Sequence, residues 1–332
     1  EVAMRVDKLV ISGHPYLVVV CGEDGYIDLV NLRPLLNNNG DQETAAGPVY
    51  NPVITAPQNG ESRVTLYFID ENTNLVPVSR AVGSTDNLYQ SALDELIRGP
   101  SRGSALYRTI PDKNIYIEAL FDAGIGRLRL DLSPELAQMS GFAQSIAALD
   151  SLLFTIGSFS EVKEIYLTVE SRELDVFGEG IILEQPLEPR RRQYPVYIPV
   201  ISGNRFYLIT REGASENALS PPLSSLVEHS LRACRSLPFV SADLALNNIE
   251  VSPEKVQLDL SGALQNLFPA EGEEQQRLQA ALVLDALFMT VFANTDTQRV
   301  EITAGGEKWI PPAGYPSLIR FYGQPFFVNP EL

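Results

Sequence analysis

The stretch that decides the fold is Leu128-Arg-Leu-Asp-Leu-Ser-Pro-Glu-Leu136, because the chain repeats it as Val256-Gln-Leu-Asp-Leu-Ser-Gly-Ala-Leu264. The offset between the two stretches is 128 positions throughout (256 − 128 and 264 − 136). Each stretch opens with leucine or valine alternating with polar residues, which is the period of a half-buried strand. Self-similarity at a constant offset is typical of duplicated structural units. The sequence therefore predicts two copies of one domain.

A second matched pair predicts a helix after this strand in each copy. Leu149-Asp-Ser-Leu-Leu-Phe-Thr-Ile156 matches Leu284-Asp-Ala-Leu-Phe-Met-Thr-Val291 at an offset of 135 (284 − 149). The difference of seven (135 − 128) indicates an insertion in the second copy, which we place in the polar stretch Glu271-Gly-Glu-Glu274. One helical face, with the spacing 3, 4, 3, is formed by Ile146, Leu149, Leu153 and Ile156 in the first copy and by Ala281, Leu284, Phe288 and Val291 in the second.

Further elements complete each copy. A final strand follows the helix, Val162–Thr168 in the first copy and Thr297–Thr303 in the second. An earlier helix has the apolar stripe Leu88, Ala92, Leu96 and Ile97 in the first copy and Leu223, Leu226, Val227 and Leu231 in the second. We expect Thr85 or Asp86 to cap the first of these helices and Gly99-Pro100 to end it. Two short strands open each copy, Val64–Phe68 and Leu75–Val78 in the first and Val196–Val200 and Arg205–Ile209, joined by a Gly203-Asn204 turn, in the second.

The predicted fold class follows from this order of elements. Each copy is strand, strand, helix, strand, strand, helix, strand, which favours an α+β domain with two helices packed on a mainly antiparallel sheet. The predicted domains are a β-rich N-terminal segment with a linker (1–60), the first copy (62–172), a linker (173–193), the second copy (194–306) and a Pro- and aromatic-rich extension (307–332). In the first segment we expect strands around 6–11, 16–21 and 26–29, and a Gly/Asn/Pro-rich linker from 37 to 60. In the extension, 319–322 and 326–328 have the pattern of edge strands.

Composition limits the classes of partner. The 332 residues carry a formal net charge of −17, which repels nucleic acid phosphates and anionic lipid. The basic cluster Arg190-Arg191-Arg192 lies between prolines, and we interpret it as a solvated linker. We therefore expect neither nucleic acid nor a bare membrane surface as a partner.

Cysteine usage and hydropathy exclude other classes. The two cysteines, Cys21 and Cys234, lie 213 positions apart (234 − 21), which favours buried apolar residues over a disulfide framework or a zinc site. No apolar run approaches the roughly 20 residues that span a bilayer. Leu17–Gly22 only faintly matches a lipoprotein cleavage site, because Val20 is large and His14-Pro15 interrupts the apolar region, so we interpret it as a buried strand.

The first copy resembles the GerMN domain of sporulation and spore germination proteins. The resemblance lies in the opening strand Val64-Thr-Leu-Tyr-Phe68, a helix that ends in Leu96-Ile-Arg-Gly-Pro100, and the later strand Leu128-Arg-Leu-Asp-Leu-Ser133. The second copy departs from this pattern, since Arg232-Ala-Cys-Arg235 replaces the stop and its opening strand holds prolines. Its assignment therefore depends on its match to the first copy.

The resemblance implies a tandem GerMN protein of a spore-forming bacterium, exported and held at a membrane by an anchor that this chain does not include. It implies assembly and scaffolding with other cell-envelope or spore-assembly proteins as partners, and no bound cofactor. GerMN domains are also similar to the ring-building domains of the machinery that joins the mother cell and the forespore. Because of the negative charge, we expect the isolated chain to be a monomer.

The best candidates for catalysis are the repeated aspartates. Asp131 and Asp150 recur as Asp259 and Asp285, and paired carboxylates catalyse glycoside hydrolysis. A second interpretation is structural: each lies beside apolar residues at the end of an element, where carboxylates accept local hydrogen bonds, and Ser133 and Ser261 stand two residues on from Asp131 and Asp259. We favour the structural interpretation and assign no catalytic, cofactor-binding or metal-ligating residue.

Other candidate residues also have a structural interpretation. His14 lies in a turn and His229 on a helix, and neither is next to a nucleophile motif. Gly124-Ile-Gly126 belongs to a hairpin and lacks the helix of a phosphate loop. Trp309 beside Pro311-Pro312 is expected to anchor packing. The alternatives to a non-enzymatic scaffold are a glycan-binding module that uses the aromatic residues of 315–327 and a hydrolase that uses the repeated aspartates.

Overall fold

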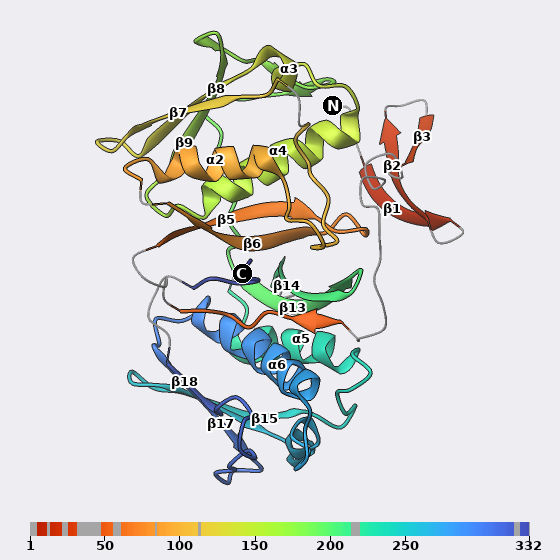
Figure 1. The fold of residues 1–332 in the computed structure, drawn as a ribbon, viewed down its shortest axis with the longest axis vertical. Coiled ribbons are helices and arrows are strands. Elements are labelled where there is room, and N and C mark those ends of the chain that lie inside the picture. Colours follow the sequence, from red (N-terminus) through yellow and green to blue (C-terminus); the bar gives the residue numbers. More distant parts are fainter. Residues whose placement is uncertain are drawn as a thin grey trace. The chain divides into compact units, whose positions relative to one another are not determined.

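The computed structural model describes residues 48–55, 61–83, 85–111, 114–213, 220–321 and 326–331 in full, and the backbone of 5–11, 14–21 and 26–31. The chain divides into two compact units (Figure 1). The first unit comprises Glu1–Glu43, Val64–Leu75 and Thr85–Arg191. The second unit comprises Thr44–Arg63, Val76–Ser84 and Arg192–Leu332.

The first unit contains a four-stranded sheet and two long helices. The strands β5 (Ser62–Ile69) and β6 (Leu75–Val82) form a separate two-stranded sheet, of which Val64–Ile69 and Leu75 belong to this unit. The helices are α2 (Leu88–Arg98), the short α3 (Pro134–Ala137) and α4 (Phe142–Gly157). The sheet has the order β10-β9-β8-β7, from β7 (Ile117–Asp122), β8 (Arg127–Leu132), β9 (Glu164–Val169) and β10 (Arg172–Glu173). Only the β8–β9 pair is parallel.

The second unit repeats this arrangement. Its opening strands are β13 (Pro195–Ser202) and β14 (Arg205–Glu212), with β4 (Val49–Tyr50) added to β14. Its helices are α5 (Leu223–Arg235), the 3₁₀ helix η1 (Gly262–Leu267) and α6 (Glu274–Phe292). Its second sheet has the order β15-β16-β17-β18, from β15 (Leu246–Val251), β16 (Val256–Leu260), β17 (Arg299–Ala304) and β18 (Ile319–Phe321). Here β16–β17 is the parallel pair.

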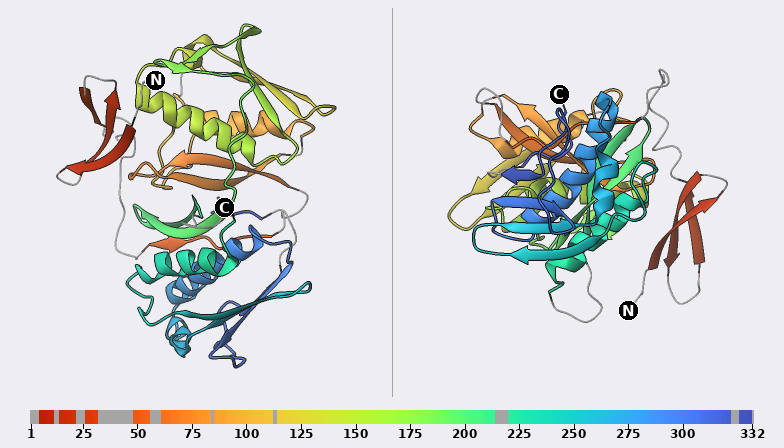
Figure 2. Two further views of the ribbon diagram at one scale, coloured as in Figure 1. Left: turned by 180° about the vertical axis from the view of Figure 1, so that it is seen from behind. Right: turned by 90° about the horizontal axis from the view of Figure 1, so that it is seen from below.

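The two units therefore share one strand order, as the internal repeat predicts. In each, a hairpin and a helix precede an antiparallel strand pair, and a second long helix leads to a strand parallel to the middle one. In the second unit, α5 and α6 lie between the β13–β14 sheet and the β15–β18 sheet (Figure 2). A sheet on each side explains why α6 is apolar nearly all round: every residue from Ala280 to Phe292 is buried.

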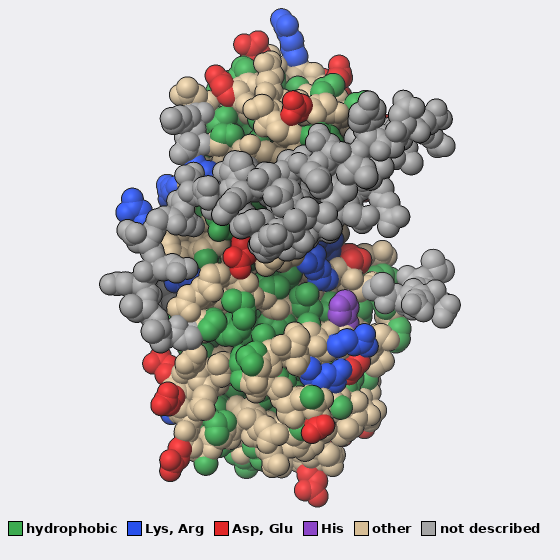
Figure 3. Space-filling view, turned by 90° about the vertical axis from the view of Figure 1, so that its right-hand side faces the viewer, with side chains coloured by type: hydrophobic (Ala, Val, Ile, Leu, Met, Phe, Trp, Pro, Cys, Tyr) green, Lys and Arg blue, Asp and Glu red, His purple; other side chains and the backbone are tan. Residues whose placement is uncertain are grey.

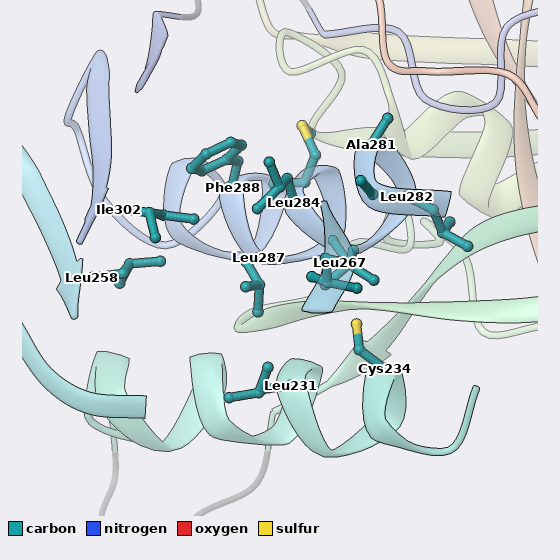
Figure 4. Packing of buried hydrophobic residues seen from close by; sticks show 14 of the residues in the cluster. Leu231, Cys234, Leu258, Leu267, Ala281, Leu282, Leu284, Leu287, Phe288 and Ile302 are labelled. Atoms are coloured by element: carbon teal, nitrogen blue, oxygen red, sulfur yellow. The ribbon is translucent and has the colours of Figure 1, made fainter. Parts of the chain in front are cut away.

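The predicted helical face packs in the core of the second unit. Leu284 and Phe288 are fully buried, and Figure 4 shows them close to Leu258 of β16 and Ile302 of β17. On the other side of α6, Leu287 faces Leu231 of α5 (Figure 4). Burial of a leucine or phenylalanine stabilises the fold by about 1.5–3 kcal/mol each, so this face fixes the position of α6.

The ends of two helices refine the prediction. Asn87, and not Thr85 or Asp86, caps α2, because its side-chain oxygen accepts the Gln90 N–H at 3.0 Å. Gly99 ends α2 with a φ of 87°, a conformation that favours glycine. The insertion around Glu271–Glu274 is divided between a loop and the first residues of α6, where Gln276 accepts the Glu273 N–H at 2.9 Å.

The segment 173–193, which was expected to be a linker, is structured. Within 173–193, β11 (Val176–Phe177) pairs with β12 (Ile181–Ile182), and Phe177 is buried. The Arg190–Arg192 cluster is not a free solvated run: Arg191 donates to the carbonyls of Gly157, Phe159 and Val162 at 2.6–2.8 Å. The unpaired carbonyls at the end of α4 attract this cation, which is the physical reason for the difference.

The remaining segments fit their predictions in part. The strands β1 (Arg5–Ile11), β2 (His14–Cys21) and β3 (Tyr26–Asn31) form an antiparallel sheet, close to the expected positions. The side chains of His14 and Cys21 lie outside the described residues. In the expected linker 37–60, β4 joins a sheet and Tyr50 is buried. In the extension, β18 is an edge strand as predicted, and Phe327 pairs with Ile54.

Candidate functional site

Asp131 lies near the end of β8 and binds the loop after β9. Its Oδ1 accepts the hydroxyl of Thr168 at 2.5 Å and the N–H of Ser171 at 2.8 Å. Thr168 lies opposite Asp131 in the parallel β8–β9 pair, so the sheet itself brings the two side chains together. Ser171 has a φ of 65°, and the carboxylate holds this strained turn.

Asp259 repeats the arrangement in the second unit. Its Oδ1 accepts the hydroxyl of Thr303 at 2.8 Å and the N–H of Gly306 at 2.5 Å, and Asn247 donates to its Oδ2 at 3.1 Å. The partners keep the repeat offset of 135 (303 − 168 and 306 − 171). Partial burial acts to raise the pKa of Asp259, but the hydrogen bonds from Gly306, Thr303 and Asn247 outweigh it and hold the pKa below its usual value.

The geometry assigns both aspartates a role in the fold. Each closes the turn after the parallel strand of its own sheet with a hydroxyl and a backbone bond, as the structural interpretation predicts. The neighbouring serines do not join them. Ser261 instead bonds to the Asp243 carbonyl at 2.7 Å, and the hydroxyl of Ser133 is buried without a partner among the described residues.

The second pair of aspartates has diverged. Asp150, on α4, pairs with Arg190 at the surface. Asp285, at the matching position of α6, is 1% exposed and accepts the Tyr50 hydroxyl and the Val53 N–H, both at 3.1 Å. Asp285 therefore attaches residues 50–53 to the core. The sequence match alone does not distinguish these roles, because Tyr50 lies 235 positions before Asp285.

The other candidates have structural positions. His229 is exposed on α5, and Figure 3 shows the described histidine at the surface near basic side chains. Gly126 follows the turn of the β7–β8 hairpin, with a φ of 72°. Trp309 packs edge-on against Phe268, with ring centroids 4.9 Å apart, as expected of a packing anchor.

The aromatic residues of 315–327 are dispersed. Tyr315 also packs on Phe268, and Phe327 is 5% exposed. Phe321 is exposed, and the guanidinium of Arg299 lies 5.2 Å from its ring centre. Of the described aromatic side chains in 315–327, only that of Phe321 is exposed, so this segment offers one free ring face and not a row of them.

The described part of the chain offers little for metal or acid–base chemistry. Its acidic, cysteine and histidine side chains form no cluster suited to a metal ion. A hollow of about 500 Å³ beside α3 is lined by Pro111, Ile115, Glu135 and Gln144 among others. Glu135 is the one ionisable side chain among the lining residues, so this hollow does not bring two carboxylates together.

A repeated threonine has a structural role that sequence analysis did not single out. The Tyr67 N–H of β5 donates to Thr155 Oγ1 at 3.2 Å, and the Tyr197 N–H of β13 donates to Thr290 Oγ1 at 3.0 Å. Both threonines are fully buried and lie in the matched helix stretches, 135 positions apart (290 − 155). Their identity in both copies was the available signal. They fix the second long helix of each copy to the edge of its opening strands.

None of the described helices combines the length and hydropathy that a membrane span requires. Residues 65–175 match the family described as "Germane: Sporulation and spore germination". No curated protein matches the sequence significantly.

Similar solved structures include the following three. The tandem GerMN domains of the sporulation protein GerM from Bacillus subtilis superpose with a TM-score of 0.57 at 13% identity, over 80% of this chain and 98% of that one. The first GerMN domain of the same protein gives 0.34 at 19% identity, over 38% and 97%. A Clostridium perfringens protein provisionally described as a lipoprotein gives 0.28 at 22% identity, over 41% and 92%.

Proposed function

Because residues 65–175 are a GerMN domain within a chain that has the fold of tandem GerMN domains, we propose that this protein is a non-catalytic scaffold of bacterial sporulation or spore germination. Its partners on this proposal are other envelope or spore-assembly proteins, which it binds outside the cytoplasm. On this proposal, an anchor holds the protein at the membrane. The GerMN family description itself names sporulation and spore germination.

The observation that carries the proposal is the contrast between what the two copies share and what they do not. The shared polar side chains hold the fold: Asp131 and Asp259 close turns, and Thr155 and Thr290 fix helices. An enzyme that had kept two active sites would instead share side chains that face a common cleft. The shared residues therefore support a role for the copies as binding platforms.

The outward sheet faces have diverged. In the first unit, Arg127 lies over the ring of Tyr166, 4.8 Å from its centre, and Arg129 is exposed beside them. At the matching positions the second unit has Lys255, which pairs with Glu301 in place of the tyrosine. Arg and Tyr are enriched at protein interfaces. The difference supports distinct partners for the two copies.

The test is chemical crosslinking of the tagged chain in its native host during sporulation, followed by affinity purification. The proposal expects envelope proteins to be recovered, and expects an Arg129→Glu variant to lose some of them while the fold is retained. Recovery of the chain without crosslinked partners would contradict scaffolding. So would a hydrolase activity on cell-wall glycan that an Asp131→Asn variant loses.

The expected monomer is tested separately. Light scattering of the isolated chain across a salt series should give one chain mass at low salt, because a net charge of −17 opposes self-association. A stable large oligomer at low salt would contradict this part of the proposal and leave the crosslinking result to decide the rest.

A further inference from the structure

We propose that the outer edge of β15 is the docking site for an extended, basic segment of a partner protein, which pairs with it as an added strand. The inference rests on the proposed scaffold function and names the chemistry of one partner. An unpaired sheet edge presents N–H and C=O groups that pair readily with another chain. Natural proteins protect such edges, so the pattern of protection in this fold is informative.

In the first unit's four-stranded sheet, glutamine side chains cover the edge strand β7 and the part of β9 that lies outside its pairing with the two-residue β10. On β7, Gln90 donates to the Ile117 carbonyl at 2.8 Å and accepts the Ala119 N–H at 2.9 Å. On β9, Gln185 accepts the Leu167 N–H at 2.7 Å and donates to the Leu167 carbonyl at 2.9 Å. In each case a side-chain amide takes the place of a neighbouring strand.

The opening strands of the second unit are protected in the same way. On the outer strand β13, Thr290 accepts the Tyr197 N–H at 3.0 Å and Ser230 donates to the Tyr197 carbonyl at 2.7 Å. Asn294 donates to the Pro195 carbonyl at 2.8 Å, and Pro199 has no N–H to offer. At the far edge of this unit's second sheet, β18 has only three residues, and a very short edge strand offers little backbone for pairing.

The edge of β15 differs. Glu250 and Ser252 pair with Gln257 and Lys255, and Ser252 donates to the Lys255 carbonyl at 2.9 Å, so by the alternation of an antiparallel pair Ile249 and Val251 direct their N–H and C=O away from β16. Among the described residues, no hydrogen bond reaches these outward groups. Val251 is 62% exposed.

At Ile249, the difference between the two sheets comes from one helix position. Ala119 of β7 pairs with Leu130, and Ile249 of β15 pairs with the matching Leu258, so the two edges are equivalent. At the repeat offset of 135, Gln90 corresponds to Ser225 on α5. Ser225 is exposed, and its shorter side chain makes no described bond to β15.

The acidic side chains around β15 indicate which kind of segment binds there. Three exposed carboxylates lie along β15 and its flanks, those of Asp243, Glu250 and Glu254. Two cations beside this edge are already engaged: Lys255 pairs with Glu301, and Arg235 with Glu228. A basic strand complements this edge. A second copy of the chain is disfavoured, because it would bring the same carboxylates together and adds another charge of −17.

The experiment selects binders from a random ten-residue phage-displayed library on the full chain. The proposal expects enriched peptides with basic residues alternating with β-branched ones, and slower amide hydrogen exchange at Ile249 and Val251 when a selected peptide is bound. Val251→Pro removes an outward N–H without breaking the β15–β16 ladder, and should weaken binding at least tenfold.

Two further variants test the mechanism. Ser225→Gln restores the covering side chain found in the first unit and should weaken binding at least threefold, and Glu250→Lys should remove the preference for basic peptides. Trp309 fluorescence and circular dichroism check that each variant folds. No enrichment, or selected peptides that bind Val251→Pro and Ser225→Gln as tightly as the parent chain, would overturn the proposal. A chain dimer that Val251→Pro abolishes would replace the partner by a second copy. If the Val251→Pro variant still crosslinks to the same partners in the host, the β15 site is refuted, whereas the proposed scaffold function is not.

Discussion

Removing the carboxylate of Asp259 tests the structural role of the repeated aspartates. Asp259→Ala deletes three hydrogen bonds, from Thr303, Gly306 and Asn247. A hydrogen bond to a half-exposed carboxylate contributes about 1 kcal/mol, so the second unit should lose about 3 kcal/mol of unfolding free energy. With an m-value of about 2 kcal/mol/M, the urea midpoint falls by about 1.5 M.

Fluorescence of Trp309 is the assay, because the sequence has one tryptophan and it lies in the same unit as Asp259. Asp296→Ala, at an exposed position of that unit, is the matched control and should shift the midpoint little. Asp131→Ala, which deletes two bonds in the first unit, should be seen by circular dichroism as a loss of about 2 kcal/mol. A midpoint shift for Asp259→Ala no larger than the control's would refute the reasoning.

The stability that the Asp259 carboxylate contributes is expected to change with pH in one direction. The folded-state pKa of Asp259 is lowered, so its contribution is complete above the unfolded pKa of about 3.9 and is lost as the pH falls through the lower folded value. The stability difference between the parent chain and Asp259→Ala should therefore be constant from neutral pH to about pH 4 and shrink below it. A difference that grows on acidification would contradict the assignment.

Three further predictions concern buried positions. Asp285→Ala should destabilise the second unit by about 3 kcal/mol, measured by the same fluorescence assay, because it removes the buried carboxylate that accepts the Tyr50 hydroxyl and the half-buried Val53 N–H. Gly157→Ala should destabilise the first unit, seen by circular dichroism, because a Cβ there would lie 2.0 Å from a backbone oxygen, whereas Gly262→Ala meets nothing within 4 Å and should be neutral. Burial raises the pKa of Cys234 to about 12, so in a Cys21→Ser background this thiol should react with Ellman's reagent at pH 8 only on unfolding.

The duplicated domain could be predicted from sequence because the residues that match are those that hold each copy together. Leu128, the second residue of β8, and Val256, the first of β16, are both fully buried, and the leucine alternation marks which face is inward. Asp131 and Asp259 match because both close a turn. In each copy these residues make the same contact within their own domain. Because the contact is the same, the residues are alike in the two copies, and the repeat can be detected from the sequence.

Contacts between distant segments could not be predicted. Tyr50 is in a stretch rich in turn residues, and its burial depends on Asp285, far along the chain. β4 has two residues, too few for any periodicity to appear. From its sequence context alone, Arg191 is expected to be a solvated charge. Its hydrogen bond to the end of α4 depends on the tertiary structure. The covering of sheet edges was missed for the same reason: whether Gln90 reaches β7 is a matter of tertiary geometry.

On the scaffold proposal, the repeated aspartates hold the fold and the protein acts by binding. An Asp131→Asn/Asp259→Asn double variant tests it most directly, since asparagine keeps an acceptor for the turn but removes the charge that acid–base chemistry needs. The measurement is the efficiency of sporulation and germination in the native host when the variant replaces the parent chain, with folding checked by circular dichroism. The account predicts unchanged efficiency and an unchanged set of crosslinked partners. A folded double variant that keeps its partners and abolishes sporulation or germination would contradict it.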